Sequence, residues 1–486
     1  MKRTIILLAT GFFFLSASSL FAKEDYLAQC WKKQGQSLHE KYLTLSYRES
    51  INRLYHSMVP WQTYRSAPFG QLWINSDRFL KHDTIQGKRE KFASLTQFDP
   101  SALLSMDFGD TSFSLVTQRD VIEYTFESAR YSPVILIHYF LQHKIQPDKE
   151  SNQSFAVYNT TIGKTIVRLF IRRGNFLISK ITMLSHDDIY GDVVNSFLYD
   201  NYSSENNINF AKTVYIEKMN GMVHDTLTIS SAAIISEGVR FLKTPANFSI
   251  KADEKETSDT VTLSKFSDHI HFVTFKHADS KAMIVEFGNF LVIAESPLTS
   301  ANGELLIDAA REIAPQKPIK YFTYGHWHPW YLGGVRPFIH KGVTIVCPEC
   351  DSVYVPYLSN AKHSLEPDSL QLQPRALHTE VLRDSMTISD GKYSMTIYQI
   401  GKKSDHTLDY SIFYFPLEKM VFEGDLAWIK KDAAAAKASS RQAGLYNSIK
   451  ERNLDVATIV QAWPVTKYGL KSAFDIADLE NAMKVK

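Results

Sequence analysis

Apolar and polar residues follow two different patterns along the chain, and the change lies near residue 260. In residues 23–80, charged residues stand among Leu, Tyr and Trp at steps of three and four, which predicts mostly helix. A further helix is predicted over residues 128–144, where two apolar runs follow Pro133 in the expected first turn. We therefore expect the first part of the folded protein to begin with a helical segment.

Short segments of alternating apolar and polar residues follow this helix. Turn residues such as Arg173-Gly174 and Asn220-Gly221 separate them. The expected strands are residues 154–159, 165–171, 175–184, 193–201, 213–219 and 223–230. Neighbouring strands of this kind predict an antiparallel meander. Residues 251–259 are rich in Lys, Glu, Asp, Ser and Thr and form the expected linker to the second part.

The second part of the chain has a different order of elements. Strands are expected at residues 269–274, 282–285 and 290–294, followed by an amphipathic helix at 304–313 and a strand at 320–323. That last strand leads directly into Gly325-His326. Because α/β sheets place their sites at the carboxyl ends of strands, this loop is in a position to form a site.

Length and composition indicate a globular protein of more than one domain. The chain has 486 residues, of which 44% are hydrophobic and 22% charged, so wholesale disorder is excluded. We expect an N-terminal helical plus antiparallel β domain over residues 23–258 and a second domain over residues 259–486. The formal net charge of +2 includes no long basic run, which gives no electrostatic reason to expect a nucleic-acid partner.

The beginning of the chain indicates export. Lys2 and Arg3 precede an apolar run over residues 5–15, and small residues continue to Ala22. This order is typical of a cleaved secretory signal, so residues 1–22 are expected to be removed and the protein to be periplasmic or secreted. A lipid anchor at Cys30 is the less favoured alternative, because Gln29 fits such a site poorly.

Three cysteines are too few for a disulfide scaffold. Cys347 and Cys350 form a C-x-x-C motif, which is compatible with a redox pair or with half of a zinc site. No second cysteine pair exists to complete a four-thiolate site. We therefore favour two thiols, or one local disulfide, in a loop after a strand.

Two histidines in the loop after residue 323 are the strongest chemical signal. His326 and His328 are one residue apart, so at the end of a strand their side chains can point the same way, which suits one metal ion. Trp330 and Tyr331 follow. An indole N–H donates and does not coordinate zinc as an imidazole does, and a phenol with a pKa of about 10 is a poor anionic ligand.

From about residue 265 the chain resembles the metallo-β-lactamase fold, an αββα sandwich used by hydrolases that bind one or two zinc ions. The first motif of that family, H-x-H-x-D-H followed by Gly-Gly, corresponds to His326-Trp327-His328-Pro329-Trp330-Tyr331-Leu332-Gly333-Gly334. The resemblance implies that His406 is the next metal-binding histidine and Asp425 the carboxylate that follows it, whereas Trp463 stands where the last histidine is expected. The expected fold class is α+β, with this sandwich preceded by the helical segment and the meander.

The resemblance implies a mononuclear zinc hydrolase that acts on an ester, a thioester or an amide. His326, His328 and His406 would hold one zinc ion per chain, since three imidazoles with an open position form a catalytic site. Asp425 would complete the coordination shell or accept a proton from water, and Tyr331 would donate a proton to the leaving group. The second metal site is expected to be closed by aromatic side chains. Both residues also have an explanation without metal. His406 is compatible with a hydrogen-bonded histidine in a loop, and Asp425 is compatible with a turn residue after glycine.

Two other functions remain open from the sequence. The second domain would be a catalytically inactive binding protein if its replaced ligands have abolished metal chemistry. The meander resembles the curved half-barrel of bacterial lipoprotein-sorting carriers, which implies an envelope lipid as a ligand of the first domain. A small-molecule substrate or ligand is expected in either case, and its identity does not follow from the sequence.

Overall fold

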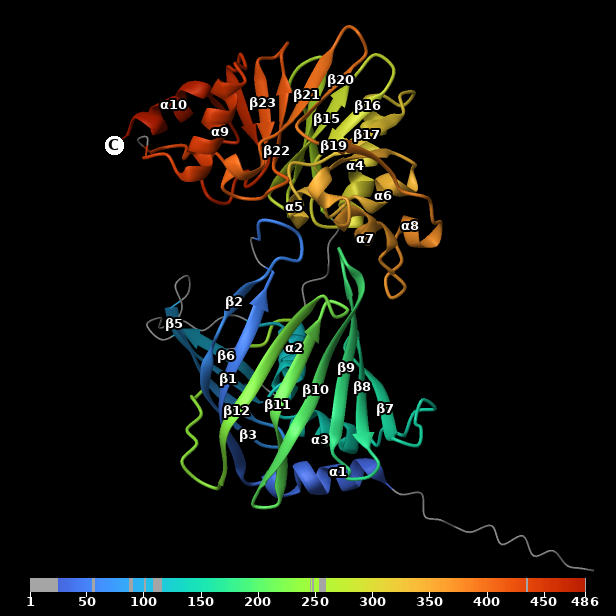
Figure 1. Ribbon diagram of the computed structural model, residues 1–486, viewed down its shortest axis with the longest axis vertical. Helices are drawn as coiled ribbons and strands as arrows, with labels where there is room; N and C mark the ends of the chain where they lie inside the picture. Colours follow the sequence, from blue (N-terminus) through green and yellow to red (C-terminus); the bar gives the residue numbers. More distant parts are fainter. Residues whose placement is uncertain are drawn as a thin grey trace, which may run out of the picture.

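The computed structural model describes residues 25–54, 57–86, 91–99, 102–107, 116–244, 246, 249–252, 259–433 and 436–485. The expected signal segment, residues 1–22, lies outside the described residues, as does most of the expected linker. The described chain forms an N-terminal lobe, residues 25–252, and a C-terminal lobe, residues 259–485, which meet end to end (Figure 1). No helix among the described residues is long and apolar enough to cross a membrane.

One large antiparallel sheet forms the N-terminal lobe. Its strand order is β6-β5-β4-β3-β1-β12-β11-β10-β9-β8-β7, and β2 pairs with β1 outside this path. The strands are β1 (Tyr42–Arg53), β2 (Tyr64–Ser66), β3 (Phe69–Ile74), β4 (Phe79–Gln86), β5 (Lys91–Asp99), β6 (Ala102–Asp107), β7 (Phe155–Ile162), β8 (Thr165–Arg172), β9 (Ile178–Asp187), β10 (Gly191–Glu205), β11 (Ile208–Lys218) and β12 (Val223–Ile235). The expected meander corresponds to β7–β12 and is confirmed.

The expectation of a mostly helical segment over residues 23–80 is wrong beyond its first turns. Helix α1 (Tyr26–Gln34) and the short η1 (Gln36–Leu38) are followed by strands β1–β4. In β1 the buried residues Leu43, Leu45 and Tyr47 alternate with less buried neighbours, which is the period of a strand. The partner of β1 is β12, far along the chain, so the local pattern does not reveal the pairing.

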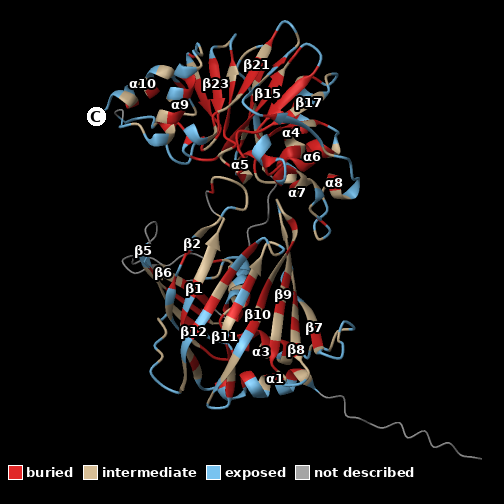
Figure 2. Cartoon of the chain, in the orientation of Figure 1, coloured by how far each residue is buried: buried red, intermediate tan, exposed pale blue. Residues whose placement is uncertain are grey.

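Three helices pack against the N-terminal sheet. The single helix expected over residues 128–144 is instead the end of α2 (Gln118–Ala129) and the whole of α3 (Val134–Gln142), separated at a turn that includes Pro133. Val134, Leu136 and Phe140 of α3 are fully buried in one core with residues of α1, α2 and the strands (Figure 2). Helix α3 therefore belongs to the core of the lobe, and an envelope lipid as its ligand stays a prediction.

The C-terminal lobe contains two mixed sheets and most of the helices. Its seven-stranded sheet has the order β13-β14-β15-β16-β17-β18-β19 and its six-stranded sheet the order β20-β21-β22-β23-β24-β25. The strands are β13 (Val261–Lys265), β14 (Ile270–Phe275), β15 (Ser280–Glu286), β16 (Leu291–Ala294), β17 (Ile319–Thr323), β18 (Thr344–Pro348), β19 (His378–Leu382), β20 (Ser385–Ser389), β21 (Ser394–Gln399), β22 (Ser411–Phe415), β23 (Met420–Glu423), β24 (Thr458–Gln461) and β25 (Ala473–Asp475). The helical elements are α4 (Ser300–Ile313), α5 (Pro329–Leu332), α6 (Arg336–His340), η2 (Glu349–Asp351), α7 (Tyr354–Asn360), α8 (Ser369–Leu372), η3 (Gly401–Ser404), α9 (Ser440–Glu451) and α10 (Ile476–Lys484).

These elements form four layers. One core joins the facing sides of the two sheets and extends to α4 and α6, and a second core joins the six-stranded sheet to α9 and α10. Helices therefore lie outside each sheet, in the expected αββα order (Figure 1). The backbone N–H of Ser411, at the start of β22, donates to the carbonyl oxygen of Gly325 just beyond β17 at 2.7 Å. This bond ties the two sheets together where the candidate site lies.

Candidate metal centre

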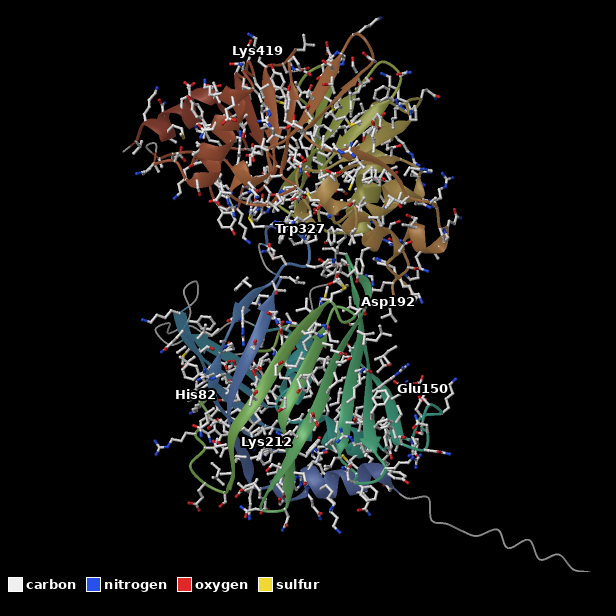
Figure 3. The ribbon with its side chains drawn as sticks, viewed as in Figure 1. His82, Glu150, Asp192, Lys212, Trp327 and Lys419 are labelled. Atoms are coloured by element: carbon white, nitrogen blue, oxygen red, sulfur yellow. The ribbon has the colours of Figure 1, made fainter. Side chains whose placement is uncertain are left out.

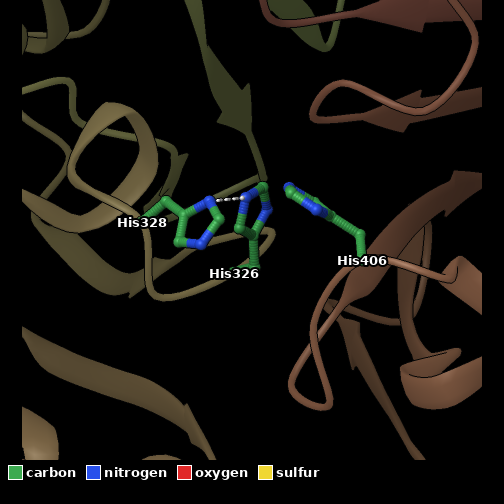
Figure 4. A group of neighbouring side chains, drawn as sticks. All are labelled: His326, His328 and His406. Atoms are coloured by element: carbon green, nitrogen blue, oxygen red, sulfur yellow. Dashed lines mark hydrogen bonds between the residues drawn. The ribbon is translucent and has the colours of Figure 1, made fainter. Parts of the chain in front are cut away.

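Three buried imidazoles converge from two separate segments. His326 and His328 lie in the loop after β17, and His406 lies between η3 and β22. Each offers one ligand nitrogen, and these atoms all lie within 4.8 Å of one another (Figure 4). The three residues are 0%, 7% and 3% exposed, and Nε2 of His326 lies 3.1 Å from Nδ1 of His328. The structure thus brings together the three histidines expected from the sequence.

Backbone anchors hold the loop of His326 and His328 in place. Pro329 occupies the first turn of α5, where its missing N–H costs no hydrogen bond, so His328 stands just before a helix. Between the two histidines, the Trp327 N–H donates to Oδ2 of Asp409 at 2.5 Å. Asp409 is 1% exposed and belongs to the segment of His406. The two ligand segments are therefore connected through this carboxylate.

Glu295 supports the same loop from the end of β16. Its two carboxylate oxygens each lie 3.1 Å from the backbone nitrogen of Gly325. A Cβ atom at Gly325 would stand 2.7 Å from Oε1 of Glu295, so a larger residue there would displace this carboxylate. Burial raises the pKa of Glu295 well above its usual range. The sequence did not predict the supporting roles of Glu295 and Asp409. For Glu295 the available signal was an acidic residue directly after an apolar strand.

Asp425 lies beside the triad. Its Oδ2 is 3.2 Å from Nε2 of His406 and 3.8 Å from Nη1 of Arg441. Burial alone would raise the pKa of Asp425, but the hydrogen bond and charge of His406, with the charge of Arg441, outweigh it, so the pKa is lowered. Asp425 therefore offers an ionised carboxylate next to the histidines. Whether it acts as fourth ligand or proton acceptor stays a prediction.

The turn after β23 places Asp425. The Tyr410 hydroxyl accepts a hydrogen bond from the Asp425 N–H at 2.8 Å and lies 3.1 Å from Oε2 of Glu423 and 3.2 Å from Oδ1 of Asp425, so it donates to one of these carboxylates. Glu423 accepts the Leu426 N–H at 2.8 Å. Burial raises the pKa of Glu423 to about 8, so its carboxyl holds a proton at neutral pH. These contacts between buried groups hold the turn that carries Asp425 in place.

Aromatic side chains fill the space beside His326. The ring of Tyr331, which is 2% exposed, lies 4.1 Å from the His326 ring, and the Trp330 and Trp463 rings lie 5.6 Å apart. A Cβ atom at Gly424 would stand 3.1 Å from the Tyr331 ring. Burial, with the nearby charges of Asp425 and Glu295, raises the pKa of Tyr331 well above its usual range. Its phenol keeps its proton, which a role as proton donor requires; that role stays a prediction.

The two cysteines of the C-x-x-C motif are thiols. Cys347 is buried and Cys350 exposed, and both are free. Burial raises the pKa of each to about 12, which disfavours the thiolate that redox exchange or zinc ligation needs. Among the described residues, the group that could hold a metal ion consists of His326, His328 and His406 and does not include these thiols.

The triad fits a metal ion. Three imidazole nitrogens with a carboxylate oxygen close by are a donor set that zinc accepts. The ligand atoms come from the loop after β17 and from the segment between η3 and β22, and they lie within 4.8 Å of one another. His326, His328 and His406 can thus hold one ion, such as zinc, with Asp425 within reach of the same place.

Comparison with known proteins gives structural relatives only. No family model and no curated protein matches the chain. About half of the chain is similar in structure to metallo-beta-lactamases. That from Pontibacter korlensis is 18% identical, over 46% of this chain and 97% of its own, with a TM-score of 0.33. FIM-1 from Pseudomonas aeruginosa, a metallo-beta-lactamase in the mono-zinc form, is 16% identical over 47% and 95%, also with a TM-score of 0.33. Likeness of this degree says nothing about chemistry.

Proposed function

We propose that this protein is an exported mononuclear zinc hydrolase that acts on an ester, a thioester or an amide. The observation that carries the proposal is the convergence of three buried imidazoles from two segments, with ligand nitrogens within 4.8 Å of one another. His326, His328 and His406 would hold the ion. When bound in such a site, zinc acts as a Lewis acid and lowers the pKa of a water molecule to near neutrality.

The chain's own residues supply the remaining parts. The carboxylate of Asp425, 3.2 Å from Nε2 of His406, is ionised at neutral pH because its pKa is lowered, so it would complete the coordination shell or accept a proton from water. The protonated phenol of Tyr331 beside His326 is the proton donor to a leaving group. The rings of Trp330 and Trp463, 5.6 Å apart, would close the second metal site.

A second candidate function follows from the burial of the site. The three histidines are at most 7% exposed, so a substrate reaches them only if side chains move. A metal ion held this deeply would instead be structural, in a C-terminal lobe that binds a partner or ligand without hydrolysing it. Both candidate functions require the same metal ion. They differ in whether a substrate can reach it.

The metal content of the purified protein tests both candidates. We expect about one zinc ion per chain, and expect it to be lost in His328→Ala, because two imidazoles rarely retain zinc. His277→Ala, which removes an exposed histidine of the same lobe, should keep the ion. Protein from zinc-supplemented cells that carries no metal would contradict both candidates.

Access to the ion separates the two candidates. The zinc is replaced by cobalt, and the visible spectrum is followed while azide is added. A hydrolase has a position that a small anion can enter, so the spectrum should change with saturation. An unchanged spectrum in protein that carries one cobalt ion would favour the structural role.

A further inference from the structure

The N-terminal lobe touches the segment of His406 directly. Residues 57–63, here called the junction loop, lie between β1 and β2 at the end of the N-terminal lobe that faces the C-terminal lobe (Figure 1). The carbonyl oxygen of Met58 accepts the backbone N–H of Leu408 at 2.8 Å. Leu408 is two residues beyond His406. A hydrogen bond from another lobe thus fixes the backbone beside a ligand histidine.

The junction loop has a shape of its own. The Gln62 N–H donates to the carbonyl oxygen of Val59 at 3.2 Å, which closes a turn. The Ser57 hydroxyl lies near the carbonyl oxygens of Leu54 and Gln62. Trp61 has φ +64°, in the left-handed region that a bulky side chain rarely adopts. Such a conformation persists only where the surroundings determine it.

The surroundings of Trp61 belong to both lobes. Its ring lies 5.9 Å from the ring of Tyr354 and 5.0 Å from that of Tyr357, both on α7, and 5.2 Å from the ring of Tyr190 in the N-terminal lobe. The hydroxyls of Tyr190 and Tyr354 lie 3.1 Å apart. Trp61 and Tyr190 pack against the core of the C-terminal lobe. The indole is therefore held between the lobes.

The same aromatic group reaches the other two histidines. The ring of Tyr354 lies 5.6 Å from the ring of Trp327, the residue between His326 and His328. Figure 3 labels Trp327 at the edge of the C-terminal lobe that faces the N-terminal lobe. The junction loop consequently contacts one ligand segment through Met58 and approaches the other through Trp61 and Tyr354.

We propose that the N-terminal lobe completes the metal centre, with the junction loop holding both ligand segments at their mutual spacing. Met58 and Trp61 are positioning residues in this arrangement, because neither touches the ion. The inference rests on the proposed function for the identity of the ion. Its structural part, that docking of the loop orders residues 325–332 and 404–410, applies to the protein with or without metal.

The experiment compares the full-length protein with Trp61→Ala, Trp61→Phe and Trp73→Ala. Trp73 is a matched control: it is also a partly buried tryptophan of the N-terminal lobe, and its recorded ring contact is with His82 of the same lobe. Backbone hydrogen exchange is followed in peptides that cover 325–332 and 404–410. Zinc affinity is measured by competition with a chromophoric chelator.

For Trp61→Ala we expect faster exchange in both peptides, including the Leu408 amide, and zinc affinity about 10-fold weaker, the size of effect seen for supporting residues of metal sites. Trp61→Phe should restore most of both properties, and Trp73→Ala should match the unchanged protein in both, whatever it does to the melting temperature. Exchange in Trp61→Ala that equals the exchange in Trp73→Ala would overturn the inference, as would faster exchange with unchanged zinc affinity. If the unchanged protein binds no zinc, the proposed function fails, and the exchange data alone decide whether the loop orders the ligand segments.

Discussion

At the scale of single residues, buried charges are matched by several partners each. Arg336, 2% exposed, donates through Nε and Nη2 to Asp368 and through Nη1 to the carbonyl oxygens of Leu358, Ser359 and Ala361. These bonds hold Asp368 ionised, with a pKa of about 2 in spite of burial. One guanidinium thus fixes the chain after α7 that approaches the N-terminal lobe.

Arg336→Met is therefore expected to lower the free energy of unfolding by about 3–5 kcal/mol, because Asp368, whose side chain is only 10% exposed, would lose its charged partner. Arg311→Met is the matched control, since Arg311 pairs with Asp308 on the exposed face of α4 and its loss should cost less than about 1 kcal/mol. Urea unfolding of both variants measures the difference. Equal losses of unfolding free energy in the two variants would show that the Arg336–Asp368 pair stabilises the fold no more than the exposed Arg311–Asp308 pair.

The candidate ligands could be predicted from the sequence, but the residues that hold them could not. His326 and His328 were identified by their spacing after a strand, and His406 and Asp425 by the resemblance. Glu295 and Asp409 act on backbone N–H groups of the His326 loop from other segments of the chain. A hydrogen bond of this kind depends on which distant segments come together in the fold, so no local sequence pattern predicts it.

At the scale of elements, the spacing of apolar and polar residues predicted the meander correctly, but it predicted helix where the first strands lie. Helix and strand patterns are hard to separate where large apolar residues are frequent, as in residues 42–49. The alternation of Leu43, Leu45 and Tyr47 with Thr44 and Ser46 is the correct signal for β1. The strand forms because β3 and β12 supply hydrogen bonds on its two sides, and those partners lie elsewhere in the sequence.

A substitution in β1 tests its assignment. Leu45→Ala should lower the free energy of unfolding of the N-terminal lobe by about 2–5 kcal/mol, because Leu45 is fully buried and alanine leaves a cavity. Ser46→Ala, on the opposite face, should change it by less than about 0.5 kcal/mol. Thermal unfolding followed by circular dichroism gives both values. Similar losses of unfolding free energy for the two substitutions would contradict the placement of Leu45 on the buried face of β1 and Ser46 on the opposite face.

At the scale of the whole molecule, several contacts join the described parts of the two lobes. One is the junction loop, a second is the start of β10, where Asp192 accepts the backbone N–H groups of Ser364 and Leu365 at 3.0 and 3.1 Å, and a third is the ion pair of Lys164 with Glu366 at 3.0 Å. A Cβ atom at Gly191 would stand 2.0 Å from the carbonyl oxygen of Lys362. His363 is buried at this second contact, and its ring lies 5.4 Å from that of His186.

This second contact predicts a pH dependence of stability. Burial and the nearby charge of Arg336 lower the pKa of His363 to about 4, whereas an unfolded histidine titrates near 6.5. Below pH 6.5 the unfolded state binds a proton that the folded state refuses, so stability falls between about pH 6.5 and 4, by up to about 3 kcal/mol. Denaturant unfolding at pH 7.5 and pH 5 measures the loss.

His363→Asn should reduce the fall in stability between these two pH values, while His277→Asn, at an exposed position, should leave it unchanged. Asp192 and Asp368 also face this region and stay ionised over the interval, since the pKa of each is lowered. An identical fall in all three proteins would assign the pH dependence to other groups.

The pairing of β1 with β12 has a consequence for synthesis. Among the described strands of the N-terminal lobe, β1 is synthesised first and its partner β12, which ends at Ile235, is synthesised last. One edge of β1 therefore stays unpaired until β12 has been made. Until then the backbone N–H and C=O groups of that edge are open, and an open edge can pair with a strand of another chain. Until the whole sheet closes, that edge of the nascent chain is therefore a place where it can pair wrongly with another copy.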